Sequence, residues 1–121
     1  MWKSPYEIER LEWFASAEEC CRVMADLHRL EAGAGMGPLA KALRLNPGLQ
    51  FDAKVWPSIA YKGGSEPGVL NMTWLLKRDD GRMFVVSFGW NDPKKDVDLK
   101  QAADIAGAGV ALVAEEGRAR E

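Results

Sequence analysis

The stretch VLNMTWLLKRDDGRMFVVSFGW, residues 69–90, decides the fold. Two runs rich in β-branched and aromatic residues, Val69–Lys77 and Met83–Trp90, flank the turn sequence Asp79-Asp80-Gly81. This arrangement predicts two antiparallel strands joined by a turn. The second run is apolar at nearly every position, which predicts a central strand with both faces covered.

Two upstream segments extend this predicted sheet. Val55 to Tyr61 reads as a strand that precedes the pair. Residues 6–14 alternate loosely between apolar and charged side chains, a pattern that fits either an edge strand or an irregular arm. The sheet is therefore expected to contain three to four strands.

A pair of helices is predicted before the sheet. Ser16 and Glu19 have the spacing of a capping box, and apolar residues then recur at helical intervals, so we expect a helix over 17–31. Glycines follow it, and Pro38 opens a short second helix that runs through Leu45 and ends at Asn46-Pro47-Gly48.

A third helix is predicted after the sheet. Asp98, with Gln101 three residues later, is placed to cap it. Its apolar stripe is made of small residues that can lie close to a sheet: Ala102, Ile105, Ala106, Gly109, Val110 and Val113.

Together these elements predict an α+β fold, in which an antiparallel sheet of three to four strands packs with an N-terminal helix pair and a C-terminal helix. A chain of 121 residues fits one domain, 1–121. Within it we expect an arm or edge strand over 1–15, a core over 16–115, and a charged tail that frays over 116–121. The tryptophans at 13, 56, 74 and 90 could line a ligand pocket or belong to the core, and we predict that they belong to the core.

Composition excludes several classes of function. The 18 acidic and 16 basic residues give a net charge of −2, with no basic stripe, so nucleic acid is not an expected partner. No apolar run reaches membrane-spanning length, and charged residues interrupt the start of the chain, so we expect a cytoplasmic protein without a membrane partner.

The potential metal ligands and nucleophiles are few. Cys20 and Cys21 are adjacent, which discourages a bridge between them, and they read as buried or half-buried free thiols. His28 is the only histidine and reads as a satisfied or surface side chain. No metal site, cofactor or catalytic residue is therefore predicted.

The segment Tyr61-Lys62-Gly63-Gly64-Ser65-Glu66-Pro67-Gly68 is predicted to lie at the end of one strand and in the turn to the next. Lysine and glycine are common at the ends of strands and in turns, whatever the function of the protein. The residues of this segment also resemble a motif of the serine β-lactamase and penicillin-binding-protein superfamily, and the order of predicted elements over most of residues 15–115 is similar to the C-terminal portion of that family.

The resemblance implies a ligand-binding role for Lys62, Gly63, Gly64 and Ser65. The Lys62 ammonium would bind a substrate carboxylate, and Gly64 would let the ligand lie against the strand. The Ser65 backbone N–H would take one oxyanion-hole position. Gly63 replaces the usual threonine, which removes a hydroxyl that the family uses for the carboxylate.

The nucleophile half of the family's site is missing from the sequence. The family's nucleophile is the serine of Ser-x-x-Lys, and no Ser or Thr of this chain has a lysine three residues later. The second element, Ser-x-Asn or Tyr-x-Asn, is also missing. In the family both elements belong to a region that would precede residue 1.

Three functions stay open at this stage. The chain is a non-catalytic module that binds a carboxylate-bearing small molecule or peptide or serves as an interaction module, or a hydrolase fragment active only when another polypeptide supplies Ser-x-x-Lys, or a remnant with no selected activity. In the complete family two further strands pair beside the strand that corresponds to Met83–Trp90. We therefore expect a homodimer through a sheet edge, with residues 6–14 contributing to its cover.

Overall fold

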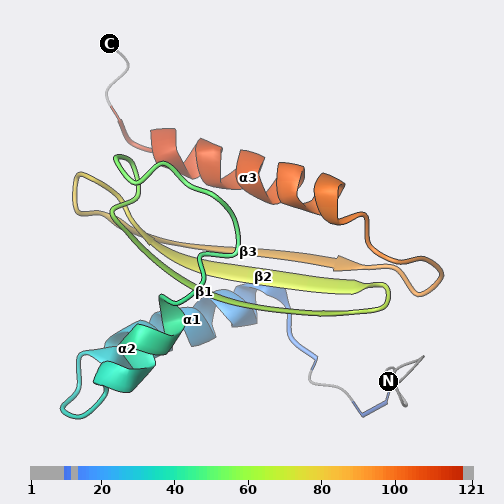
Figure 1. The fold of residues 1–121 in the computed structure, drawn as a ribbon, viewed down its shortest axis with the longest axis horizontal. Helices are drawn as coiled ribbons and strands as arrows, with labels where there is room; N and C mark the ends of the chain where they lie inside the picture. The colour runs from blue at the N-terminus through green and yellow to red at the C-terminus, as the bar shows by residue number, and fades with distance from the viewer. Residues whose placement is uncertain (1–9, 12–13, 119–121) are drawn as a thin grey trace.

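The computed structural model describes residues 10–11 and 14–118. Its elements, in chain order, are α1 (Ala17–Glu31), α2 (Gly37–Leu43), β1 (Ser58–Glu66), β2 (Val69–Lys77), β3 (Met83–Asn91) and α3 (Leu99–Glu115). The predicted α+β fold is confirmed, with a three-stranded antiparallel sheet. Helix α3 lies on one side of this sheet, and α1 and α2 lie on the other (Figure 1). None of these helices is long and apolar enough to cross a bilayer.

The strand order is β1-β2-β3, so β2 is the central strand. The prediction that the strand starting at Met83 is central is wrong for the described residues, where β3 is an edge. Helices α1 and α3 both contact β3, from opposite sides. Its apolar sequence therefore reflects two covered faces. The hydrophobicity of a strand does not show whether the strand pairs with one neighbour or with two.

Strand β1 is shifted relative to its prediction. It spans Ser58–Glu66, whereas the sequence predicted Val55 to Tyr61. The glycines and Ser65 continue to pair with β2 as far as Glu66 opposite Val69. Only Pro67 and Gly68 form the turn, and Gly68 has the φ of 77° that the second central position of a type II turn requires. Pairing with β2 thus overrides the weak strand propensity of this segment.

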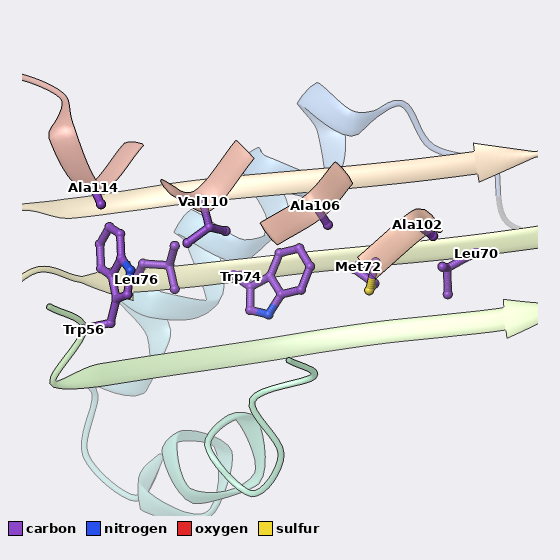
Figure 2. Close-up of a cluster of buried hydrophobic side chains, with 9 residues drawn as sticks. All are labelled: Trp56, Leu70, Met72, Trp74, Leu76, Ala102, Ala106, Val110 and Ala114. Carbon is purple, nitrogen blue, oxygen red and sulfur yellow. The ribbon is translucent and has the colours of Figure 1, made fainter. Parts of the chain in front are cut away.

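The larger core lies between the sheet and α3 (Figure 2). One face of β2 contributes Leu70, Met72, Trp74 and Leu76, and α3 contributes four small residues one turn apart: Ala102, Ala106, Val110 and Ala114. Trp56 and Trp74 are buried and Trp90 is half-buried against this cluster, as predicted, whereas the fourth tryptophan of that prediction, Trp13, lies outside the described residues. Ile105 is instead 48% exposed, because the helix directs it away from the sheet.

A smaller core lies on the opposite face, where Met24, Leu43, Ala60 and Leu75 are buried together. The predicted capping box at the start of α1 is confirmed by reciprocal hydrogen bonds between Ser16 and Glu19. Helix α2 begins at Gly37, with Pro38 in its first turn. It ends at Leu43, and Leu45, which was expected in the helix, is exposed beyond it.

The predicted strand or arm over residues 6–14 falls mostly outside the described residues. Residues 10, 11 and 14 are described and are not part of a strand. At the other end, α3 stops at Glu115, and only 116–118 of the predicted tail are described.

A buried arginine joins the β2–β3 turn to the end of α3. Arg78 is 1% exposed and donates hydrogen bonds to the backbone carbonyls of Val113, Ala114 and Glu116. It also pairs with Asp80, and its guanidinium lies 5.0 Å from the centre of the Phe84 ring. The carbonyls at a helix C-terminus have no partners within the helix, so the arginine satisfies them and complements the helix dipole.

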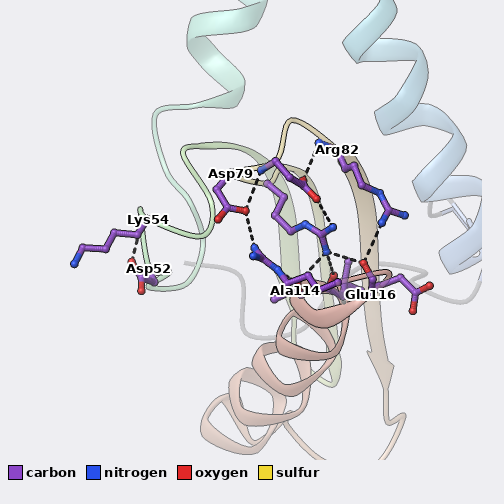
Figure 3. Close-up of polar contacts among 10 residues, drawn as sticks. Asp52, Lys54, Asp79, Arg82, Ala114 and Glu116 are labelled. Atoms are coloured by element: carbon purple, nitrogen blue, oxygen red, sulfur yellow. Dashed lines mark hydrogen bonds and ion pairs between the residues drawn. The ribbon is translucent and has the colours of Figure 1, made fainter. Parts of the chain in front are cut away.

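Two neighbouring arginines extend this cluster (Figure 3). Arg82 donates to the Glu116 carbonyl, and Arg118 donates to the Ala114 carbonyl and to Asp79. The hydrogen bond from Arg78 holds the pKa of the Asp80 carboxyl at about 2. The turn and the helix end are therefore fixed to each other by charge-assisted hydrogen bonds.

Candidate functional site

The predicted site lies within β1, on one edge of the sheet in the described part of the chain. Successive strand residues point to opposite faces, so Lys62 and Gly64 face the α1 side and Gly63 and Ser65 face the α3 side. The structure therefore keeps the four residues contiguous along the edge, but Lys62 and Ser65, the two with side chains, face opposite sides of the sheet.

The Lys62 side chain is exposed, and its ammonium group lies against the backbone of the next residue. Its Nζ donates a hydrogen bond of 2.6 Å to the carbonyl oxygen of Gly63. An ammonium group carries three protons, so two donors stay available beyond this contact. The side chain thus places a positive charge directly beside the backbone of the edge.

The hairpin sets which backbone groups of β1 point outward. Glu66 and Val69 flank a two-residue turn and form a hydrogen-bonded pair, and such pairs alternate along antiparallel strands. The N–H and C=O groups of Gly63 and Ser65 consequently point away from β2. The bond from Lys62 to the Gly63 carbonyl agrees with this orientation. The edge therefore presents two N–H donors next to the lysine charge.

The two glycines of the motif have different surroundings. A Cβ atom added at Gly64 would meet nothing within 4 Å, so the sheet surface is open there. A Cβ added at Gly63 would lie 1.9 Å from the Tyr61 hydroxyl oxygen. Tyr61 packs against Trp74, with ring centres 5.4 Å apart, and burial raises the pKa of its hydroxyl. The tyrosine thus occupies the space that a threonine at position 63 would need.

A polar row crosses the sheet beside Lys62. Thr73 of β2 stands opposite Lys62 and Ser87 of β3 in the strand register. Thr73 is 4% exposed, donates to the Asn71 side-chain oxygen and contacts the Ser87 hydroxyl at 3.0 Å. Since its single proton goes to Asn71, Thr73 accepts from Ser87. Sequence reasoning missed Asn71 and Thr73, although they alternate with the apolar residues of β2.

An ion-pair cluster holds the start of β1 against the helices. Arg44 donates two hydrogen bonds to Glu31, of 2.6 and 2.8 Å, and lies 3.4 Å from the Ser58 hydroxyl. These bonds, with one from His28, hold the Glu31 pKa at about 2. A shallow hollow beside the cluster is lined by His28, Glu31, Ala32, Ala40, Lys41 and Arg44. It is separate from the β1 motif, and its one carboxylate, Glu31, is paired with Arg44 and His28.

The other reactive side chains lie on α1. Cys20 and Cys21 are free and half-buried, as predicted, and burial raises the Cys21 pKa. His28 is bonded to Glu31 and partly exposed, which agrees with its predicted role as a satisfied side chain. Within residues 10–11 and 14–118, no three His, Cys, Asp or Glu side chains gather as a metal site would need.

Comparison with known proteins finds neither a matching family model nor a matching curated protein. The β-lactamase-like relationship therefore stays a prediction from the β1 motif. What the geometry itself defines is an open strand edge with one lysine charge, two outward N–H groups and an uncovered glycine.

Proposed function

We propose that the chain is a non-catalytic, β-lactamase-like binding module, in which the edge of β1 takes the carboxylate end of a small molecule or extended peptide. The observation that carries the proposal is the open surface at Gly64 beside the exposed Lys62 ammonium. An extended ligand would receive hydrogen bonds from the outward N–H groups of Gly63 and Ser65, as in the addition of a strand to a sheet edge. Lys62 would pair with its carboxylate.

The lysine charge gives the proposal a direct test. Lys62→Gln is expected to weaken binding of N-acetyl-trialanine roughly tenfold, since a charge-assisted hydrogen bond is lost, and to leave binding of the C-terminal amide unchanged. Affinities can be measured by NMR titration of backbone amides, with the largest shifts expected at residues 62–66.

Lys77→Gln is the matched control, because Lys77 is also an exposed strand lysine but lies at the far end of β2. It should bind both peptides as the unmodified chain does. Equal affinity of the unmodified chain for the acid and the amide, or an unchanged affinity in Lys62→Gln, would refute the proposed site.

The alternative is a hydrolase fragment completed by a second polypeptide that carries Ser-x-x-Lys. The bare Gly64 favours it, because it leaves room on the α1 side of the sheet for another chain. The purified chain is expected to gain no covalent adduct from a fluorescent penicillin or a fluorophosphonate, since no Ser or Thr in the sequence has a lysine three residues later. Intact-mass spectrometry would detect one, and a stable acylated serine would overturn the non-catalytic proposal.

Two further parts of the proposal concern the setting of the module. We propose a cytoplasmic protein, which the two unpaired thiols support. We also propose a homodimer joined at β3, the sheet edge opposite β1, so that both β1 edges stay open to ligand.

A further inference from the structure

The two edges of the sheet differ in how well they resist pairing with another chain. Strand β1 carries Lys62 and Glu66, and charged side chains protect natural edge strands from pairing with the edge of another sheet. Strand β3, with the sequence MFVVSFGWN, has no charged residue and no proline over its nine residues. An apolar edge strand without such features is a template for strand pairing. Of the two edges, β3 is the one suited to a protein partner.

The side chains of β3 also form an incompletely covered apolar row. On the α3 side of the sheet its residues are Phe84, Val86, Phe88 and Trp90, all of them half-buried. Helix α3 contacts β3 and packs its four buried residues into the cluster on this face (Figure 2), yet the four β3 side chains keep part of their surface exposed. Extension of the sheet beyond β3 would bury the remaining surface of this row.

The outward backbone groups of β3 follow from the pairing of the other strands. Along β2, residues whose backbone bonds to β1 alternate with residues whose backbone bonds to β3. The odd-numbered residues of β2 bond to β1 and the even-numbered ones to β3. Their partners, the even-numbered residues of β3, therefore direct their N–H and C=O groups toward β2. The groups that point outward belong to Met83, Val85, Ser87, Gly89 and Asn91.

We propose that β3 pairs with β3 of a second copy, antiparallel, with Ser87 opposite Ser87 on the two-fold axis. This register is the one that uses the strand's full length, since residues 83 and 91 then stand opposite each other. In this register every residue whose backbone N–H and C=O point outward stands opposite another such residue. On the α3 side, Phe84 lies opposite the second copy's Trp90. The result is a continuous six-stranded sheet with an unbroken apolar row on its α3 side.

Charge complementarity selects the same register. One residue beyond the strand at each end, Arg82 stands opposite Asp92 of the second copy, and the two-fold axis repeats the pair. Arg82 is exposed and uses only Nη1 for its bond to the Glu116 carbonyl, and only the Oδ1 atom of Asp92 accepts from the N–H groups of Lys94 and Lys95 in its turn. A shift by two residues in one direction would instead bring Arg82 opposite Lys94. Opposite charges across strands stabilise pairing, and like charges oppose it.

The dimer is tested first by blocking the edge. The full chain is expected to sediment as a dimer at tens of micromolar, and Gly89→Pro to weaken association at least tenfold, because proline removes an outward N–H. A Cβ at Gly89 would make only ordinary contact, 3.6 Å from the Asn71 amide nitrogen, so the variant should keep the native circular dichroism spectrum. A monomeric full chain, the result expected if residues 6–14 cover β3 instead, would overturn the proposal.

The register is tested by cross-linking. Facing residues of a hydrogen-bonded pair have Cα atoms about 5.5 Å apart, within the range of disulfides. In a background with Cys20→Ser and Cys21→Ser, Ser87→Cys should form a disulfide dimer under mild oxidation, and Ser65→Cys on the opposite edge should not. Cross-linking through position 65 alone would contradict the interface. This inference rests on the proposed homodimer and not on ligand binding, so failure of the peptide titration leaves it intact.

Discussion

Arg78→Ala is expected to lower the thermal unfolding midpoint by on the order of 10 °C. The substitution removes hydrogen bonds to three carbonyls at the end of α3 and the ion pair with Asp80. Arg118 and Arg82 still bond to the Ala114 and Glu116 carbonyls, so the loss falls on the charge-assisted hydrogen bonds of the buried guanidinium and on the space that it fills. The contact with Phe84 is lost as well. Thermal denaturation followed by circular dichroism would measure the change.

Arg82→Ala is the control for this prediction, because Arg82 belongs to the same turn but is exposed and bonds to one carbonyl only. Its midpoint should fall by no more than a few degrees. If the two variants unfolded at the same temperature, the α3 end would not depend on the buried arginine.

Trp74→Ala is expected to cost about 3–5 kcal/mol of unfolding free energy, the usual range for truncation of a buried aromatic side chain. Trp74 is 0% exposed and packs edge-on against Phe51, with ring centres 6.1 Å apart. Its indole N–H donates 2.8 Å to the Pro47 carbonyl, which fastens the segment before β1 to the sheet. A domain of ordinary stability would lose much of its net free energy of unfolding, and urea denaturation would measure the loss.

Trp74→Phe separates the two contributions. It keeps an aromatic ring in the core but loses the hydrogen bond to Pro47, so a loss of about 1–2 kcal/mol is expected. A loss in Trp74→Ala as small as that in Trp74→Phe would mean that the core closes around the missing ring.

Elements with local signals could be predicted from the sequence. The Ser16–Glu19 capping box defined the start of α1, and the Asp98 side chain accepts from the Gln101 N–H at the start of α3, as its spacing predicted. Strand β2 has the predicted bounds, since alternation and turn residues define both of its ends. In each case the decisive interactions lie within a few residues of one another.

The errors arose where long-range pairing decides the structure. The residues Lys62 to Ser65 have turn-like propensity, yet nine paired positions with β2 hold them in a strand. The apolar sequence of β3 indicated that both of its faces are covered, but it did not show that the strand lies at an edge of the sheet. Arg78 follows a strand as an ordinary charged residue would, and its burial depends on the end of α3, more than thirty positions later.

The candidate site was predicted in part. Sequence placed Lys62 and Gly64 together, but it did not show that Gly63 and Ser65 turn to the other face, or that Tyr61 fills the space over Gly63. Both features depend on the register with β2 and on packing against Trp74. The sequence of four consecutive residues does not by itself show which face of the sheet each of them takes.

Each strand of the sheet pairs with its neighbour in the chain, through one turn of two residues and one of five. Closing such short loops costs little conformational entropy, and low contact order goes with fast folding. The sheet can therefore form from local encounters before the distant helix ends dock on it. For a chain with an unprotected apolar strand, a short unfolded lifetime limits the exposure that leads to aggregation.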